Sequence, residues 1–352
     1  MTLTDLGFDE WFQQQSDIQS YQIARVLTVN RDNYLITTGE VQMTAQLTGN
    51  LMYGSDSPLD FPAAGDWVAA DIVDDSLAII HSVLPRKTLL KRKTAGKTVE
   101  FQLIAANIDT AMIMQSLDDN FNLRRLERYL VVVLDSGIQP LILLSKSDLM
   151  PPADIKEKIK DINTLQPGIE VLPFSSTKGS GVKKITSRLQ PGHTYCLLGS
   201  SGVGKTTLIN RLLHEDAYST QSVRRDGKGR HTTTRRELML LPNGALMLDT
   251  PGMRELGHFD TDAGLDAAFA DIAELAELCR FKDCNHEHET GCAVLKALES
   301  GELDEDRYGN YIKMKKEAAH YSRSYHQRRE RDKEFGKMVK AVKKLKKKTG
   351  KY

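Results

Sequence analysis

The stretch Tyr195-Cys-Leu-Leu-Gly-Ser-Ser-Gly-Val-Gly-Lys-Thr-Thr207 decides the fold class of this chain. Residues Gly199–Thr206 fit the pattern G-x-x-x-x-G-K-[ST], follow the apolar run Tyr195–Leu198 and precede a predicted helix over Thr206–Leu213. A strand, a glycine-rich loop and a helix in this order form a phosphate-binding loop. Backbone N–H groups at the start of the helix would surround the phosphates. Lys205 would bridge the β- and γ-phosphates, and the Thr206 hydroxyl would coordinate Mg²⁺.

A second motif, Ser145-Lys146-Ser147-Asp148, follows the apolar run Pro140–Leu144. A carboxylate at the end of a strand can accept hydrogen bonds from N1–H and the exocyclic amine of guanine, whereas adenine presents an acceptor at N1. Each such charge-assisted bond contributes roughly 1.5–3 kcal/mol, so a pair selects strongly for guanine. Lys146 would lay its alkyl stem over the base. Ser175-Ser176-Thr177 would direct backbone N–H groups toward the guanine O6.

A third motif, Asp249-Thr-Pro-Gly252, fits the D-x-x-G switch of GTPases. Asp249 would hold Mg²⁺ through water, and the Gly252 amide would sense the γ-phosphate. One hydroxyl of Thr232-Thr233-Thr234 would close on the Mg²⁺ when GTP is bound. Met253 stands where Ras-like GTPases place the glutamine that orients the attacking water, so slow intrinsic hydrolysis is expected. His231 is the nearest polar candidate for that task, with a solvated loop histidine as the alternative.

The order of these motifs is rotated. In an ordinary small GTPase the phosphate loop comes first, whereas here the guanine-reading motif precedes it and the switch follows. The expected domain is therefore an α/β P-loop GTPase with a circularly permuted chain, built on a mostly parallel sheet with helices on both faces and one antiparallel edge hairpin.

The cysteines predict a metal centre. Cys279, Cys284, His286 and Cys292 have the spacing C-x4-C-x-H-x5-C, which suits one structural zinc ion in a closed tetrahedral site. His288 is an alternative ligand, and three buried free cysteines are the alternative to a metal. Cys196 lies in the strand before the phosphate loop and is expected in the core. Disulfides are disfavoured in the cytosol, where we expect this chain.

The remaining segments predict the domain organisation. Five short strands between residues 21 and 85 suit a small β-barrel of the OB type, a class that often binds nucleic acid. Residues 86–97 hold six cations and are interpreted as a basic linker. The expected units are an N-terminal extension (1–20), the barrel (21–85), the permuted GTPase domain with its linker (86–257) and a helical zinc domain with a lysine-rich tail (258–352). One helix is predicted over Ala263–Leu278.

Charge and hydropathy limit the function classes. The 352 residues have a net charge of +1, but residues 313–352 alone carry 16 Lys+Arg and 4 Asp+Glu. Such a segment is typical of a polyanion-binding tail or of a solvated, partly helical tail. The longest apolar runs stay below 18 residues, so we expect no membrane span.

The combination of motifs resembles the RsgA (YjeQ) family of circularly permuted GTPases of small ribosomal subunit biogenesis. The resemblance includes Gly65-Asp66-Trp67-Val68 and the run from Phe121 to Leu130. It implies a late assembly factor, a monomer, whose domains contact the small subunit and its 16S rRNA. It also implies GTP hydrolysis that the subunit stimulates and that accompanies release. His231 matches the family's proposed catalytic histidine. Ser145 stands where the family usually has Asn or Thr, and a serine hydroxyl could preserve the loop tethering.

Two alternatives remain open at this point: an adenine-nucleotide-dependent RNA enzyme and a zinc-dependent nucleic-acid-binding regulator. The residues predicted to bind GTP or GDP are Ser145, Lys146, Ser147, Asp148, Ser175, Ser176, Gly199, Ser200, Ser201, Gly202, Val203, Gly204, Lys205, Thr206 and Thr207. The residues predicted for the switch and Mg²⁺ are Thr206, Thr232, Thr233, Thr234, Asp249 and Gly252.

Overall fold

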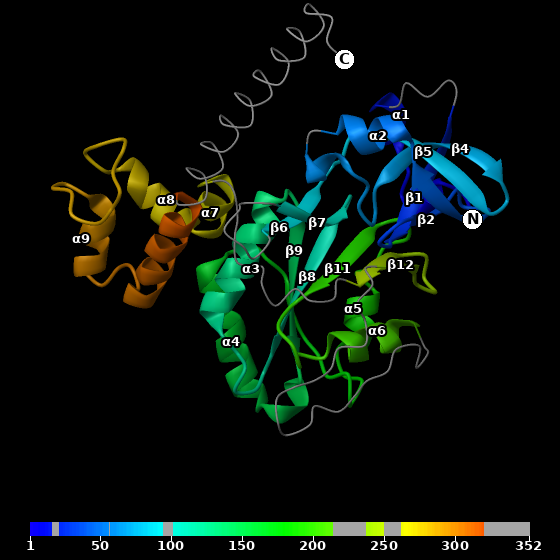
Figure 1. The fold of residues 1–352 in the computed structure, drawn as a ribbon. Helices are drawn as coiled ribbons and strands as arrows, with labels where there is room; N and C mark the ends of the chain where they lie inside the picture. Colours follow the sequence, from blue (N-terminus) through cyan, green and yellow to red (C-terminus); the bar gives the residue numbers. More distant parts are fainter. Residues whose placement is uncertain (16–20, 56, 94–100, 214–236, 250–261, 320–352) are drawn as a thin grey trace, which may run out of the picture.

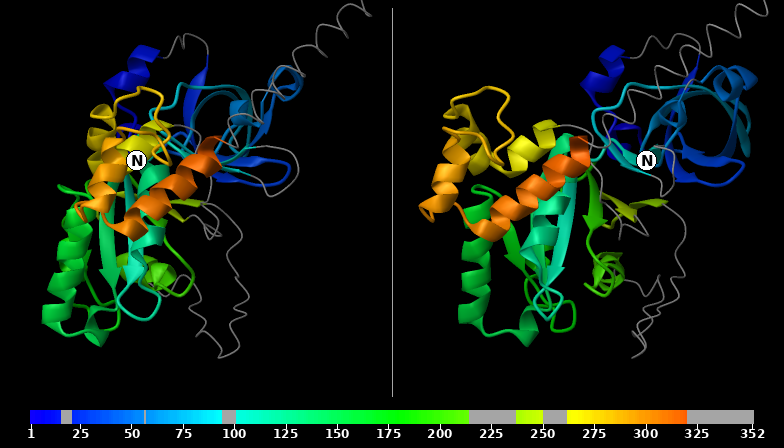
Figure 2. Two further views of the ribbon diagram at one scale, coloured as in Figure 1. Left: turned by 90° about the vertical axis from the view of Figure 1, so that its left-hand side faces the viewer. Right: turned by 60° about the vertical axis from the view of Figure 1, so that its left-hand side comes forward.

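The computed structural model describes residues 1–15, 21–55, 57–93, 101–213, 237–249 and 262–319. A small barrel, a central sheet and a helical region follow one another across the molecule (Figure 1). Two further views show the same three parts, with the helical region on the opposite side of the sheet from the barrel (Figure 2). Within these residues, no helix combines the length and the apolar character that crossing a bilayer would require.

The N-terminal barrel has five strands, in the order β1-β2-β3-β5-β4, with β4 pairing back onto β1. The β3–β5 pair is parallel and the other pairs are antiparallel. Alternate side chains such as Ala24, Val26 and Ile80 fill the interior. The predicted five-strand barrel of the OB type is confirmed. Its strands are β1 (Gln22–Val29), β2 (Tyr34–Thr37), β3 (Gln42–Leu47), β4 (Trp67–Asp74) and β5 (Leu77–Val83), with the short helices α2 (Gly49–Gly54) and η2 (Pro58–Asp60) between β3 and β4.

The central sheet has the order β10-β9-β8-β11-β13-β12 and is parallel except for its last strand. The predicted antiparallel edge hairpin is formed by β12 and β13, which are joined by a turn at Pro242-Asn243-Gly244. β12 also pairs with β1 at Glu237 and Thr28, which joins sheet and barrel. The strands are β8 (Thr110–Ser116), β9 (Gln139–Ser145), β10 (Val171–Pro173), β11 (Thr194–Leu198), β12 (Glu237–Leu240) and β13 (Leu246–Asp249).

Helices cover both faces of this sheet because its buried strands are apolar on both sides. Ala111 and Ile113 of β8 face the same core as α3, α4 and α7. Met112 and Met114 alternate with them and pack with α5 and α6 in a second core. The predicted two-faced α/β layer is confirmed. The bounds are α3 (Leu123–Asp135), α4 (Pro152–Leu165), α5 (Val182–Thr186), α6 (Lys205–Leu213) and α7 (Asp262–Ala268).

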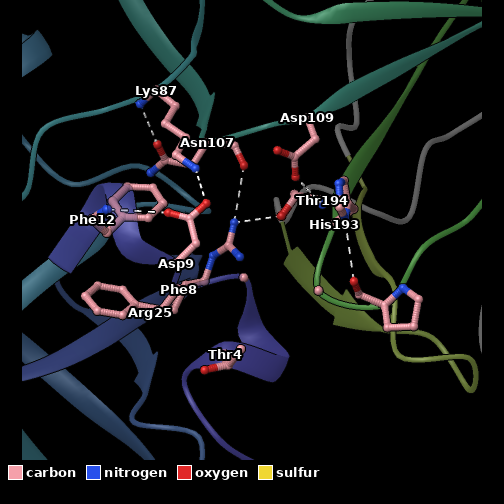
Figure 3. Close-up of a pocket in the computed structure, with 13 residues that line it drawn as sticks. Thr4, Phe8, Asp9, Phe12, Arg25, Lys87, Asn107, Asp109, His193 and Thr194 are labelled. Atoms are coloured by element: carbon pink, nitrogen blue, oxygen red, sulfur yellow. Dashed lines mark hydrogen bonds and ion pairs between the residues drawn. The ribbon is translucent and has the colours of Figure 1, made fainter. Parts of the chain in front are cut away.

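Residues 1–15 of the predicted N-terminal extension pack against the barrel. It forms η1 (Thr4–Leu6) and α1 (Glu10–Gln15), and the rings of Phe8 and Phe12 lie 4.9 and 5.9 Å from that of Trp67. Beneath them the buried Arg25 guanidinium donates to the carbonyls of Leu6, Gly65 and Asn107, and to the Thr194 hydroxyl at 2.7 Å. Burial lowers the pKa of Arg25 to about 10, so this side chain stays charged at neutral pH. A cavity of about 200 Å³ lies beside it (Figure 3).

Residues 86–93 of the predicted basic linker are part of the folded structure. β6 (Leu89–Lys93) and β7 (Phe101–Ala106) form a separate antiparallel hairpin. Arg86 forms a bidentate ion pair with the buried Asp66 at 2.7 and 2.8 Å. Lys87 pairs with Asp9. Arg86 therefore binds the barrel, and Lys87 binds the N-terminal segment. The Arg86 side chain is largely buried in its ion pair.

The helix predicted over Ala263–Leu278 is two helices, α7 and α8 (Ala270–Glu277), and that prediction is corrected at Phe269. Phe269 leaves the helical conformation (φ −122°, ψ 48°) and buries its ring against Tyr311, 5.5 Å away. The break leaves the Ala268 carbonyl free to accept a bond from Arg307 at 3.3 Å. α9 (Ala293–Glu299) and a helix over residues 305–319 complete the region.

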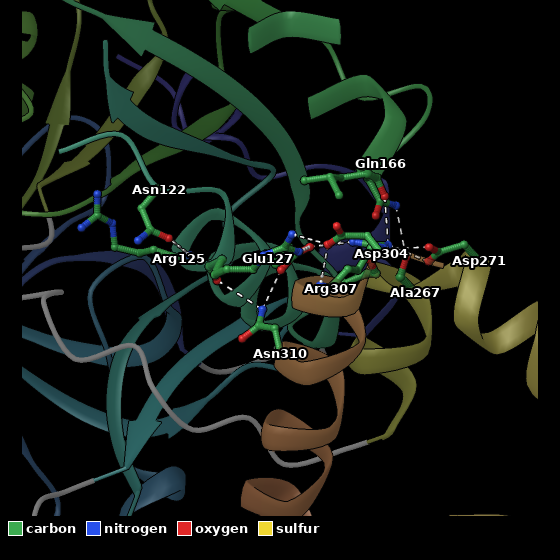
Figure 4. A network of polar contacts seen from close by, with 12 residues as sticks. Asn122, Arg125, Glu127, Gln166, Ala267, Asp271, Asp304, Arg307 and Asn310 are labelled. Carbon is green, nitrogen blue, oxygen red and sulfur yellow. Dashed lines mark hydrogen bonds and ion pairs between the residues drawn. The ribbon is translucent and has the colours of Figure 1, made fainter. Parts of the chain in front are cut away.

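A buried polar network joins this helical region to α3, which covers one face of the sheet (Figure 4). Arg307 donates to Glu127 of α3 at 2.7 Å and to Asp271 of α8 at 2.6 and 2.7 Å. Glu127 also accepts from Asn310 at 2.6 Å and from Arg124 at 2.7 Å. Both Arg307 and Glu127 are almost fully buried, so the removal of either side chain would leave the other buried with fewer partners.

Candidate nucleotide site and metal centre

The phosphate loop lies between β11 and α6, in the predicted strand–loop–helix context. A Cβ at Gly199 would stand 2.6 Å from the Met114 carbonyl, so only glycine fits there. Gly204 has φ +98° and immediately precedes the first residue of α6, Lys205. The Lys205 ammonium donates to the Gly199 and Ser200 carbonyls at 2.7 and 2.8 Å. It is thereby held over the loop that the sequence assigned to the phosphates.

Asp249 ends β13, the neighbour of β11 in the parallel sheet, and so lies at the same edge as the phosphate loop. Burial raises the pKa of Asp249, and the positive charge of Lys205 counteracts this increase. Asp249 thus lies at the edge of the sheet where its predicted Mg²⁺ role requires a carboxylate. The other switch residues assigned from the sequence, Thr232, Thr233, Thr234 and Gly252, lie outside the described residues, as does the candidate catalytic His231.

The base-reading motif directly follows β9. Lys146 adopts a left-handed backbone (φ 58°), and Ser147–Leu149 form a short 3-10 turn that exposes Asp148. The Ser175 side chain hydrogen-bonds Asp148 and lowers the pKa of that carboxyl, which keeps it charged. The Ser147 amide donates to the Phe174 carbonyl at 3.1 Å. The fold thus brings the Ser145–Asp148 and Ser175–Ser176 motifs together.

Ser145 joins the base-reading loop to the phosphate loop. Its buried hydroxyl donates to the Val203 carbonyl at 2.6 Å, and the Gln115 carbonyl lies 3.3 Å away. This is the tethering that a serine hydroxyl was expected to preserve. Lys205 and Asp148, which come from loops 57 positions apart, therefore belong to one connected edge of the sheet.

Sequence reasoning missed a third segment, the loop after β8. Asp118 pairs with the Lys146 ammonium at 2.7 Å, and the Asn120 side chain donates to the Ser200 hydroxyl at 3.0 Å. β8 lies between β9 and β11, so its carboxyl end falls between the two nucleotide loops. The polar run Asp118-Asp119-Asn120 after a predicted strand was the available signal, because ligands bind at the carboxyl ends of strands in such sheets.

The four predicted metal ligands form one cluster: the donor atoms of Cys279, Cys284, His286 and Cys292 all lie within 4.8 Å of one another. The Cys279 and Cys292 sulfurs are 3.8 Å apart, and the His286 Nδ1 lies 3.6 and 3.5 Å from them. A tetrahedral zinc with bonds of about 2.3 Å to sulfur and about 2.0 Å to nitrogen requires separations of about 3.8 and 3.5 Å. The donor set and its spacing therefore fit a metal ion of that size. His288 is exposed and lies outside the cluster.

Backbone amides donate to two of the three sulfurs of the cluster. The Ala293 amide points at the Cys279 sulfur at 3.4 Å, and the Leu295 amide at the Cys292 sulfur at 3.4 Å. Burial would raise the pKa of the Cys279 thiol, but hydrogen bonds from the Ala293 and Val294 amides outweigh it and lower that pKa. Tyr308 donates to the His286 carbonyl at 2.7 Å and links the cluster to the helix over residues 305–319. Cys196 is buried in β11, away from the cluster, as predicted.

The fold and the order of its motifs define a class, the circularly permuted P-loop GTPases. The RsgA GTPase family model matches residues 83–259. The chain is 43% identical over 299 residues to the small ribosomal subunit biogenesis GTPase RsgA 2 of Lactiplantibacillus plantarum, covering 85% of this chain and 84% of that protein. It is 41% identical over 338 residues to RsgA of Opitutus terrae, covering 92% and 91%. The chain therefore belongs to the RsgA family of small ribosomal subunit biogenesis GTPases.

Solved structures agree in fold. YjeQ from Thermotoga maritima superposes with a TM-score of 0.64 at 24% identity, covering 85% of this chain and 99% of that one. YloQ, a circularly permuted GTPase, gives a TM-score of 0.61 at 23% identity, with 86% and 96% covered.

Proposed function

We propose that this chain binds guanine nucleotides and hydrolyses GTP on the small ribosomal subunit during a late step of its assembly. Hydrolysis would be stimulated by the subunit and would accompany release from it. The single observation that carries the nucleotide assignment is the bond from the Ser145 hydroxyl to the Val203 carbonyl, because it joins the base-reading loop to the phosphate loop. The family membership supports the role in assembly.

In this proposal the loop after β9 binds the base, and the loop after β11 binds the phosphates. Asp148 accepts from the guanine N1–H and amine, and Lys146 covers the base. The amides of Gly199–Thr207 and the Lys205 ammonium hold the phosphates. Asp249 and Thr206, with one of Thr232–Thr234, would hold Mg²⁺, and Gly252 would sense the γ-phosphate. Mg²⁺, when bound, would neutralise charge that develops on the phosphates during hydrolysis.

Hydrolysis itself is proposed to depend on the partner. Met253 has no group that orients water, so we assign that task to His231 when the subunit is bound. The Cys₃His cluster is proposed to hold one structural zinc ion, whose ligation would stabilise the helical region. The 16S rRNA is the proposed polyanion for the +12 segment at residues 313–352.

The first test is nucleotide choice. A fluorescent GDP analogue should be displaced by GDP but not by a hundredfold excess of ADP, because Asp148 repels the adenine N1 acceptor. The Asp148→Asn variant should lose GDP and gain xanthosine diphosphate, whereas the control Asp154→Asn, an exposed aspartate of α4, should bind as the wild type does. Equal displacement by ADP would favour the adenine-nucleotide alternative.

The second test is stimulation by the partner. GTP hydrolysis is measured alone, with purified small subunits and with large subunits. We expect stimulation of about 10³-fold or more by small subunits alone, as for other GTPases whose partner completes the catalytic site. The His231→Ala variant should bind GTP normally and lose most of that stimulation. No stimulation by small subunits would reject the proposed target.

A further inference from the structure

The loop after β8, residues 117–120, lies between the two proposed nucleotide loops. β8 lies between β9 and β11 in the sheet. β9 leads into Lys146, and β11 leads into the loop that contains Ser200. The loop contacts both neighbours by side chain, through Asp118 and Asn120 respectively. Neither residue belongs to the GTPase motifs identified above.

The Asp118 carboxylate is fixed at both of its oxygens. Oδ1 accepts from the Ser116 hydroxyl at 2.6 Å and from the Asn120 amide at 3.1 Å. Oδ2 is left for the Lys146 ammonium at 2.7 Å. These two bonds fix the orientation of the carboxylate independently of Lys146. Only the lysine side chain therefore loses conformational freedom when the ion pair forms.

The ion pair with Asp118 restricts the conformation of the Lys146 side chain. Its backbone is held in the left-handed region at φ 58°, and its side chain remains about one third exposed. A lysine stem of four methylenes has many rotamers unless its ammonium is fixed. We propose that Asp118 is a positioning residue for base recognition, which holds the Lys146 stem in the orientation that covers the guanine. This inference rests on the proposed nucleotide site.

The same loop ties base recognition to the phosphate loop. Asn120 accepts a bond from Arg125 at its carbonyl and donates from its side chain to Ser200. Asn120 thus holds Ser200, while Asp118 holds Lys146. Loss of the Asp118–Lys146 contact should therefore weaken binding of the base, and loss of the Asn120–Ser200 contact should weaken binding of the phosphates.

The experiment measures GDP binding by fluorescence and pyrophosphate binding by competition in the full-length chain with Mg²⁺. Asp118→Asn keeps the acceptor for Ser116 and the Asn120 amide but removes the charge that faces Lys146. It should weaken GDP about three- to tenfold and leave pyrophosphate unchanged. Asp119→Asn removes the same charge from an exposed neighbour and should change neither. Asn120→Ala should weaken both ligands together.

A double-mutant cycle separates positioning from general stability. In a Lys146→Met background, Asp118→Asn should have no further effect on GDP, because its action passes through Lys146. Unchanged GDP binding in Asp118→Asn would overturn the inference, and so would an equal loss of GDP and pyrophosphate. Failure of the wild type to bind GDP would instead reject the proposed nucleotide site, on which the inference depends.

Discussion

The hydroxyl of Ser145 shows how much one side chain can organise. It is buried at the end of β9 and donates at 2.6 Å to the Val203 carbonyl, which lies in the middle of the phosphate loop. A threonine would present the same hydroxyl, and asparagine would present an amide N–H that could donate to the same carbonyl. Serine at this position therefore supplies the same kind of donor as a threonine or an asparagine would.

Removal of that donor should weaken the site. Ser145→Ala leaves the Val203 carbonyl without its partner, which should cost about 1–2 kcal/mol of stability and weaken GDP by up to about tenfold. Ser145→Thr should stay within about twofold of the wild type. Chemical denaturation and fluorescent GDP titration measure the two effects. Wild-type affinity in Ser145→Ala would show that the tether does not support nucleotide binding.

At the scale of elements, α3 has contacts in two directions. Asn122 caps its start by accepting from the Arg125 amide at 2.8 Å, and the Arg125 side chain reaches back to the loop before it. Arg124, Glu127 and Arg128 face the other way and bond residues of the C-terminal helical region. One helix thus contacts both the loop beside the nucleotide site and the region that carries the metal cluster.

The Arg307–Glu127 pair should be a main contribution to the stability of the contact between α3 and the C-terminal helical region. Arg307→Met leaves Glu127 charged and buried with fewer partners, so we expect a loss of about 3–5 kcal/mol. Glu127→Leu combined with Arg307→Met should recover part of it, because an apolar pair needs no compensation. Arg188→Ala, which removes an exposed pair with Glu170, should change stability by less than about 1 kcal/mol. Urea unfolding free energies test the series, and equal losses for Arg307→Met and Arg188→Ala would contradict it.

The sequence predicted the elements that carry the nucleotide motifs because each motif directly follows an apolar strand. It could not predict contacts between residues far apart in the chain. Glu127 and Arg307 are 180 positions apart and resemble ordinary solvated helix charges. Asp118 contacts Lys146 only because β8 lies beside β9. The break between α7 and α8 depends on the packing of the Phe269 ring against Tyr311. The β6–β7 hairpin was not predicted because the lysines and arginines of β6 obscure the apolar pattern of a strand.

On the scale of the whole molecule, the Cys₃His cluster and the proposed nucleotide site belong to different layers. The cluster lies among α8, α9 and the helix over residues 305–319, whereas α6 and the phosphate loop pack on the other face of the sheet. Among the described residues, the cluster shares with the sheet the core that α3 covers, whereas the phosphate loop and α6 pack in the second core. Loss of the metal should therefore unfold one layer before the other.

Metal removal tests this separation. Chelation, or Cys292→Ser, should remove one bound zinc and about 10 kcal/mol or more of ligation energy from the helical region. Amides of residues 270–303 should then exchange hydrogen rapidly, while GDP affinity should stay within about threefold of the holoprotein. Cys196→Ala, which removes a core thiol outside the cluster, should keep one zinc per chain. If chelation abolished GDP binding together with the protection of the helical region, the two layers would fold as a single cooperative unit and the separation argued from their cores would be wrong.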